Sequence, residues 1–221
     1  MRVRITFSKT GPLKYIGNLD LYALWERAVR RAGLPLMYSN AFHPQPKLNF
    51  ASALPLGFTS RCEVVDLRLD QEIEPSDLSQ RLQGAMPSGI FILDVRGVEE
   101  SSPALQTQVI AAEYEVTITE TNMISDSALS RSDVISGEGS RSLKHNIEAI
   151  MAESSLPRER RGKAYDLRPL IENLEVVSEN KLFMRLTARE GATGRPEEVL
   201  DALGIAIENT WIERVNLIFL K

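Results

Sequence analysis

Residues 38–50 bring amides, aromatic rings and a positive charge together in one short, proline-rich stretch. Proline fixes a backbone dihedral and lacks an N–H, so the side chains between the prolines stand on a stiffened loop. A lysine there can contact phosphate, amides can bond to base edges, and rings can stack on unpaired bases. The candidate nucleic-acid-binding residues of this segment are Tyr38, Asn40, Phe42, His43, Gln45, Lys47 and Asn49. The alternative is structural: Phe42 and Phe50 belong to a core, and the polar groups satisfy the backbone of an irregular loop.

A second group of candidates lies on the basic face of a predicted helix. Arg27, Arg30 and Arg31 share that face, and Lys9 and Lys14 lie shortly before it in the chain. Guanidinium groups bond bidentately to phosphate oxygens, so these five residues extend the candidate nucleic-acid site if the loop lies on the same side. Otherwise the arginines form an ordinary solvated helix face.

Two residues are weak candidates for catalysis. Asp20 can act as a general base, or it can simply complement the positive end of the helix dipole. His43 can serve as a general acid or base, as histidines often do, but the sequence around it has no serine or cysteine nucleophile with a paired carboxylate. The sequence also lacks a Walker A motif and a dinucleotide-binding glycine motif. Without a complete catalytic constellation, the sequence leaves open whether the protein is an enzyme.

Cysteine and histidine usage limits the cofactors that this chain can hold. Cys62 is the only cysteine, so neither a disulfide, a cysteine-based zinc site nor an iron–sulfur cluster can form within one chain. The two histidines, His43 and His145, are too few for a histidine-rich metal site. We therefore predict that this chain binds no metal or cofactor, and that Cys62 is a small core residue.

Positive charge is concentrated in the first quarter of the sequence. The 221 residues have a formal net charge of −4. Residues 1–60 nevertheless contain eight lysines and arginines against two acidic residues, a balance of +6, which leaves −10 for the rest. Such asymmetry indicates an anionic partner, or else a solvated basic surface. No stretch approaches the roughly 20 apolar residues of a membrane span, and the first residues lack the apolar run of a signal peptide, so we expect a cytoplasmic location and no membrane partner.

Hydrophobic periodicity predicts the elements that position these residues. Val3, Ile5 and Phe7 alternate with polar residues and belong on one face of a strand. Asn18 is the expected N-cap of the basic helix, and Gly33 ends it. The predicted elements are strands at 2–8, 63–69 and 90–95 and helices at 18–32 and 76–86. With one more strand hidden in residues 36–54, residues 1–100 follow the order β-α-β-β-α-β of a ferredoxin-like module.

The second half of the sequence repeats that order. Its predicted elements are a strand at 112–119, a helix at 143–152, a hairpin of 174–177 with 181–188, a short helix at 196–203 and a final strand at 211–220. We therefore predict an α+β fold of two tandem ferredoxin-like modules with antiparallel sheets, residues 1–100 and 109–221. The serine-rich stretch 121–142 is the candidate mobile loop. The basic run 158–163 can extend an anion-binding surface or be an exposed linker, and Arg195 has no assigned role.

Several short motifs resemble a known bacterial family. They lie at residues 8–11, 18–21, 27–32, 34–35, 38–39, 42–44, 46–47, 53–57, 166–169 and 194–204. Together they resemble the radical-SAM-linked (radical SAM-associated) family of unknown function. This sequence has Asn18 and Ala41 where many members have His and Gly. The resemblance implies a radical SAM protein as partner, including cobalamin-binding ones, and genes for RNA processing nearby; S-adenosylmethionine and an iron–sulfur cluster are then expected only in that partner.

A weaker resemblance is architectural. The tRNA pseudouridine synthase A type also has two ferredoxin-like halves, and its Asp-containing loop followed by Gly, an apolar residue and His is similar to residues 39–43 here. Ser39 or Asn40 occupies the place of the catalytic Asp. The resemblance therefore implies an RNA-binding relative of that architecture more than an isolated uracil isomerase.

Together these observations predict an RNA-binding accessory protein that presents tRNA or rRNA to a radical SAM enzyme of RNA modification or processing. Two alternatives stay open. One is an RNA-modifying enzyme of pseudouridine-synthase-like architecture that uses Asp20 and His43. The other is a protein-docking module, in which the basic surface contacts an acidic surface of the radical SAM partner.

Overall fold

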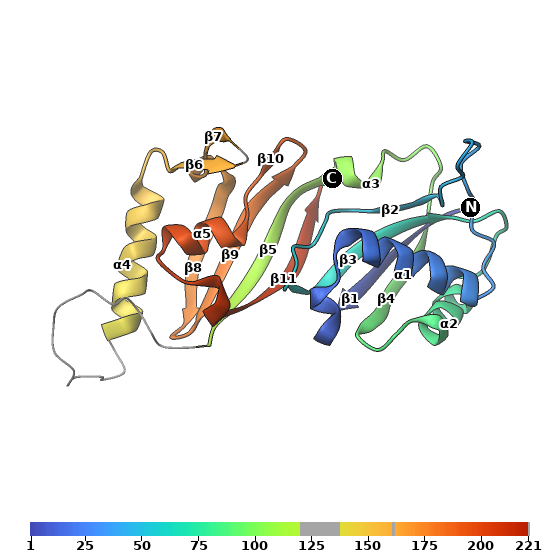
Figure 1. The fold of residues 1–221 in the computed structure, drawn as a ribbon, viewed down its shortest axis with the longest axis horizontal. Coiled ribbons are helices and arrows are strands. Elements are labelled where there is room, and N and C mark those ends of the chain that lie inside the picture. Colours follow the sequence, from blue (N-terminus) through green and yellow to red (C-terminus); the bar gives the residue numbers. More distant parts are fainter. Residues whose placement is uncertain (120–137, 161, 221) are drawn as a thin grey trace. The chain divides into compact units, whose positions relative to one another are not determined.

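The computed structural model describes residues 1–119, 138–160 and 162–220. The chain is an α+β protein with mostly antiparallel strands (Figure 1). It forms two compact units, and the chain passes between them twice. Unit 1 contains Met1–Ile110 together with Arg214–Lys221, and unit 2 contains Ala111–Glu213.

Unit 1 contains the loop and the basic helix singled out above. Its elements are β1 (Arg2–Lys9), the short 3-10 helix η1 (Gly11–Tyr15), α1 (Asn18–Arg31), β2 (Leu48–Phe50), β3 (Thr59–Arg68), α2 (Pro75–Ala85), β4 (Ile90–Val98) and α3 (Leu105–Gln108). The strands pair antiparallel in the order β2-β3-β1-β4, and β11 (Thr210–Phe219) is also a neighbour of β3, on the side opposite to β1. The strand predicted within residues 36–54 is β2, and the two predicted helices are confirmed.

One face of the unit 1 sheet is covered by α1 and α2 (Figure 1). Val3, Ile5 and Phe7 lie on that face, as their alternation predicted, and are completely buried. The rings of Phe7 and Trp25 of α1 are 4.8 Å apart between centroids. Burial of each such side chain contributes about 1.5–3 kcal/mol, so this apolar layer holds α1 on the sheet.

The ends of α1 follow local rules. Gly17, one residue before the predicted Asn18, is the N-cap. At the other end Gly33 has a φ of 65°, its N–H donates to Arg30 O, and the next N–H, of Leu34, donates to Val29 O. This pair of bonds is a Schellman motif, which needs a left-handed residue, so the predicted glycine stop is confirmed.

Unit 2 contains the elements between residues 111 and 213. Its elements are β5 (Val109–Ile118), α4 (Glu138–Ala152), β6 (Pro157–Arg160), β7 (Lys163–Asp166), the 3-10 helix η2 (Arg168–Leu170), β8 (Ile171–Ser178), β9 (Lys181–Arg189), β10 (Ala192–Thr193), α5 (Pro196–Ala202), the 3-10 helix η3 (Ile207–Asn209) and the start of β11. Antiparallel β9 pairs with both β5 and β8. The predicted hairpin is therefore confirmed as β8–β9.

Two features of unit 2 differ from the sequence-based expectations. The described residues of the basic run at 158–163 belong to an antiparallel hairpin, β6–β7, that periodicity did not predict because each strand has only four residues. Of the predicted mobile loop 121–142, residues 121–137 lie outside the described residues, and residues 138–142 form the first turns of α4. The finer prediction of two tandem ferredoxin-like modules stays a prediction.

Candidate nucleic-acid interface

The proline-rich segment is attached to α1 by two tyrosines. Tyr22 of α1 donates its hydroxyl to Pro46 O at 2.7 Å, and the hydroxyl of Tyr38 donates to Glu26 of α1 at 3.2 Å. Tyr38 and Pro46 also form an isolated β-bridge, which closes the loop 39–45. We call residues 39–45 the tip loop. The tip loop therefore lies beside α1.

Phe42 and Phe50 have different environments, although both could be interpreted from the sequence alone as ligand-binding or as core residues. Phe50 packs against the core, with ring centroids 6.2 Å from Phe7 and 6.4 Å from Trp25. Phe42, in the tip loop, is 95% exposed, and its ring meets that of His43 edge-on at 4.8 Å. Phe42 is therefore the most exposed aromatic ring of this segment.

The tip loop carries three of the polar candidates of the segment. Asn40, His43 and Gln45 are all exposed. The backbone N–H of Gln45 donates to the Ser39 hydroxyl at 2.9 Å, and the Ser39 N–H donates to Gln45 O. The loop therefore satisfies its own backbone at its base and leaves the side chains at its tip to solvent.

The arginines of α1 lie on both sides of the exposed helix surface. Arg30 lies close enough to Tyr38 to lower the pKa of that residue slightly. Burial and the neighbouring Glu26 raise the pKa of Tyr38, so its hydroxyl stays a neutral donor at physiological pH. Arg27 and Arg31 line a pocket of about 310 Å³ on the other side, between α1 and Pro87. Asp20 lines the same pocket, and Arg31 also donates to Ala85 O at 2.8 Å.

The two lysines before α1 differ in accessibility. Lys9 is buried, and its ammonium donates to Ile16 O at 3.1 Å. Burial lowers its pKa, an effect that Glu63 partly opposes. Lys14 is half-buried and places its ammonium 5.0 Å from the centre of the Tyr15 ring. Lys14 can therefore contribute to a basic surface, whereas Lys9 has a structural position.

Lys47 and Asn49 lie on the opposite face of the unit 1 sheet. Side chains alternate along a strand, and Leu48 and Phe50 of β2 point into the core under α1. Lys47 and Asn49 consequently line a separate pocket of about 270 Å³, which we call the back-face pocket. Its lining residues are Arg2, Lys47, Asn49, Asp66, Arg68, Ser102, Ala104 and Leu105. The structure thus divides the predicted site between two faces.

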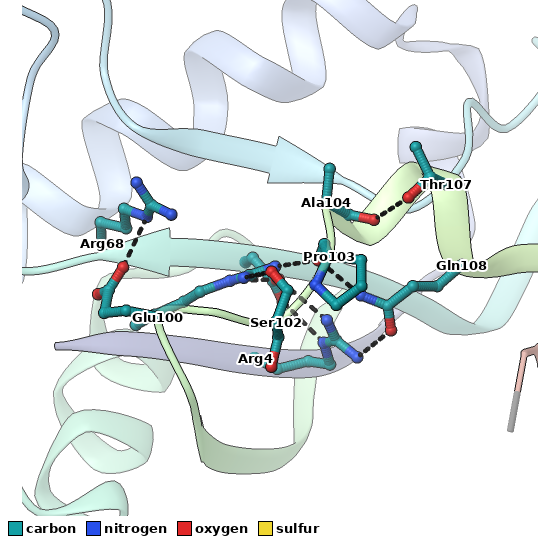
Figure 2. A network of polar contacts seen from close by, with 10 residues as sticks. Arg4, Arg68, Glu100, Ser102, Pro103, Ala104, Thr107 and Gln108 are labelled. Atoms are coloured by element: carbon teal, nitrogen blue, oxygen red, sulfur yellow. Dashed lines mark hydrogen bonds and ion pairs between the residues drawn. The ribbon is translucent and has the colours of Figure 1, made fainter.

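Buried ion pairs hold the floor of the back-face pocket. Asp66 of β3 accepts hydrogen bonds from Arg2 at 2.7 and 3.1 Å and from Arg4 at 2.8 and 3.1 Å. Arg4 also reaches Gln108, and Arg68 pairs with Glu100 at 3.2 Å (Figure 2). The charge count from the sequence therefore overstated the free positive surface of residues 1–60, because Arg2, Arg4 and Lys9 are all buried.

The catalytic candidates do not assemble into a constellation within the described residues. Asp20 lines the pocket beside α1, whereas His43 lies in the tip loop with its ring against Phe42. Burial raises the pKa of the Cys62 thiol to about 11, which makes it a poor nucleophile. In the described ranges no group of three or more His, Cys, Asp or Glu side chains is placed to hold a metal ion.

Unit 2 contains a pocket that sequence reasoning did not find. It measures about 560 Å³ and is lined by Arg160, Lys163, Tyr165, Asp166, Leu170, Gly191, Ala192, Thr193 and Arg195. Arg160 lies 4.8 Å from the centre of the Tyr165 ring and pairs with Glu198. The basic run at 158–163 and the unassigned Arg195 were its two signals, but they are more than 30 residues apart and meet only in the folded unit.

These features define an α+β protein with an exposed aromatic loop beside a basic helix and two further positively lined pockets. Sequence comparison identifies the family of the chain. The model of the family described as "Uncharacterized protein conserved in bacteria (DUF2344)" matches residues 2–196, so the chain belongs to this family. No curated protein matches the sequence significantly. Among the helices of the described residues, none has the length and apolar character needed to cross a membrane.

Proposed function

We propose that the protein binds RNA, tRNA or rRNA, through α1 and the tip loop of unit 1. The observation that carries the proposal is the position of Phe42: a 95% exposed ring on a loop that two tyrosine hydrogen bonds fix beside a helix with three exposed arginines. Stacking of an unpaired base on an aromatic ring contributes about 1–3 kcal/mol, and arginines supply the phosphate contacts.

The arrangement suits single-stranded or looped RNA better than a regular duplex. The major groove of an RNA duplex is too deep and narrow for side chains to read, whereas bases in loops can be splayed out and stacked. In the proposed complex a base stacks on Phe42 and His43, and the flanking phosphates contact Arg30 and then Arg27. Asn40 and Gln45 provide amides that can bond to base edges.

We further propose that this RNA-binding protein serves a radical SAM enzyme, which would hold the S-adenosylmethionine and the cluster. The support is the set of short motifs described under Sequence analysis. The antiparallel order β2-β3-β1-β4, with both helices on one face, also supports a ferredoxin-like module in unit 1.

Filter binding of total tRNA and of rRNA fragments to the purified protein, at low and moderate salt, tests the proposal. The variants are Phe42→Ala and the double change Arg27→Ala with Arg30→Ala. Loss of stacking in Phe42→Ala should weaken binding about 5- to 100-fold, which corresponds to about 1–3 kcal/mol. The double variant should weaken binding to all RNAs by a similar factor, since phosphate contacts carry no sequence information.

Two matched controls make the test specific. Phe91→Ala removes another exposed phenylalanine of unit 1, from β4, and Arg189→Ala removes an exposed arginine of β9 in unit 2. Both should bind RNA as the unchanged protein does. Full RNA affinity in Phe42→Ala and in the double arginine variant would refute the interface.

The two other functions give different results in the same experiment. A docking module would bind no RNA at either salt concentration but would co-purify with its radical SAM partner, and Phe42→Ala would reduce that co-purification. An enzyme would turn over RNA without any partner, and turnover would be lost in Asp20→Asn and in His43→Ala.

A further inference from the structure

We propose that the back-face pocket of unit 1 binds a phosphate group. The pocket lies on the face of the sheet opposite to α1, so the inference does not depend on the RNA interface. It rests on the charge balance of the pocket floor, on the donors that line its wall and on its size.

The floor of the pocket contains more buried positive than negative charge. Arg2 is 6% exposed, Arg4 8% and Asp66 3%. Among the described side chains the two guanidinium groups share this one carboxylate. Their remaining donors bond to the neutral oxygens of Ser102, Pro103 and Gln108. Because a buried charge is costly unless it is compensated, this floor favours an additional anion.

The wall of the pocket adds further positive charge. Arg68 pairs with Glu100, and Lys47 reaches the pocket from the residue before β2. Across Arg2, Arg4, Lys47 and Arg68, against Asp66 and Glu100, four positive charges face two negative ones, a balance of +2. A dianionic phosphate group would neutralise that balance.

Three donors of the wall are available to a ligand. Lys47, Asn49 and Ser102 line the pocket, and within the described part of the chain their side chains have no hydrogen-bond partner. Asn49 lies directly opposite Asp66 in the β2–β3 register, and Arg4 lies opposite Asp66 on the other side. The amide of Asn49, the carboxylate of Asp66 and the guanidinium of Arg4 therefore form one row across β2, β3 and β1, with the amide donor at the β2 end.

The size of the pocket indicates which part of a ligand it holds. Its volume of about 270 Å³ is below the roughly 300–1,000 Å³ of pockets that enclose a drug-sized molecule. A phosphate group fits such a space, while the remainder of the ligand would extend into solvent. That phosphate can come from a small phosphorylated molecule or from the 5′ end of an RNA.

The full chain should be titrated by calorimetry with inorganic phosphate, with adenosine 5′-monophosphate and with adenosine. We expect the first two to bind and adenosine not to bind. Lys47→Met keeps the length of the side chain and removes its charge, and should weaken phosphate binding at least tenfold, since hydrogen bonds to charged groups contribute about 1.5–3 kcal/mol. Lys144→Met, an exposed lysine of α4, is the matched control and should have no effect.

A second pair of titrations distinguishes the source of the phosphate. An oligoribonucleotide with a 5′-phosphate is compared with the same oligoribonucleotide with a 5′-hydroxyl. If the protein prefers the 5′-phosphorylated oligoribonucleotide and Lys47→Met abolishes that preference, the pocket binds RNA ends. If the two oligoribonucleotides bind equally well and adenosine monophosphate still binds, the pocket binds a small phosphorylated ligand.

Two results would overturn the inference: no binding of inorganic phosphate or adenosine monophosphate to the unchanged protein at millimolar concentration, or equal affinities in the unchanged protein and in Lys47→Met. The Arg27→Ala, Arg30→Ala variant keeps the two proposals apart. It should lose RNA affinity and still bind inorganic phosphate as the unchanged protein does.

Discussion

The buried pair of Glu63 and Arg214 illustrates how much a single residue can matter in unit 1. Their side chains are 2% and 1% exposed, and the guanidinium donates to the carboxylate at 2.6, 2.7 and 2.9 Å. Arg214 also donates to the Ser52 hydroxyl and to the carbonyl oxygens of Ser52 and Ala53. Removing one member breaks this pair, while the other stays charged and buried.

We therefore expect Glu63→Ala to lower the free energy of unfolding by about 3–5 kcal/mol, the cost of an uncompensated buried charge. Urea unfolding, followed by circular dichroism, measures the loss. Asp77→Ala is the control, because it removes a partly exposed partner of Arg81 on α2 and should cost about 1 kcal/mol or less. Equal losses in the two variants would contradict the importance assigned to burial.

Cys62 offers a prediction about pH. Burial, reinforced by the charge of Glu63, raises the pKa of its thiol to about 11 from an ordinary value near 9. The folded chain therefore holds the thiol proton between pH 9 and 11, where an unfolded chain releases it, so this contribution to stability is present below pH 9 and is lost as the pH rises towards 11.

The rate of alkylation by iodoacetamide follows the thiolate and measures this pKa directly. In the folded protein the rate should rise only as the pH approaches 11, and in urea it should rise around pH 9. A folded-state rate that reaches its plateau by pH 9 would show that the thiol is not held protonated.

At the scale of an element, two glycines of unit 1 should respond in opposite ways to substitution by alanine. Gly33 has a φ of 65° at the end of α1, and a Cβ there would lie 3.3 Å from a guanidinium nitrogen of Arg81. Gly84 lies inside α2 with open space around it. The same substitution therefore strains one site and removes excess flexibility at the other.

Gly33→Ala should destabilise unit 1 by about 1 kcal/mol, because alanine disfavours the left-handed conformation. Gly84→Ala should stabilise it by about 0.5–1 kcal/mol, through the higher helix propensity of alanine. The midpoint of urea unfolding would measure both changes. Shifts in the same direction would mean that helix propensity does not explain them.

The elements also show which parts of the structure the sequence could predict. Local periodicity found β1, α1, α2 and the β8–β9 hairpin, since each is encoded by residues that are close in the chain. Local periodicity did not identify the buried charges. Arg2 and Arg4 were expected at the surface, because their partner, Asp66, is more than 60 residues away in the chain. The same limit applies to Phe42 and Phe50, which differ only in the contacts that the folded unit makes.

The candidate site was predictable in composition and not in geometry. Aromatic and basic residues of the segment 38–50 were identified, but the side of the sheet on which each lies was not. The alternation along β2 sends Lys47 to the back face, although the sequence grouped it with the arginines of α1. Assigning that alternation requires knowledge of where a three-residue strand begins, which is the least certain feature of any sequence reading.

For the whole molecule, the concentration of basic residues in unit 1 predicts how proposed RNA binding depends on salt. Each phosphate contact to a single strand contributes about −0.7 to the slope of log K against log salt concentration. If Arg27, Arg30 and Arg31 each make one contact, the slope should be about −2, and the double arginine variant should reduce it to about −0.7. Filter binding over a salt series measures the slope, and a value unchanged in the variant would place the phosphate contacts elsewhere.

The arrangement of the chain in unit 1 affects the order in which the protein can be completed during synthesis. Glu63 leaves the ribosome long before Arg214, because 151 residues separate them. A nascent unit 1 must keep the carboxylate of Glu63 hydrated, with β3 incompletely packed, while all of unit 2 is being made. The cell therefore handles an unfinished first unit for the time needed to synthesise about 100 residues, roughly 5–20 s at bacterial rates. During that interval unit 1 should be most sensitive to proteases and most dependent on chaperones. In the finished unit the buried ion pair of Glu63 and Arg214 stabilises the packing of β3.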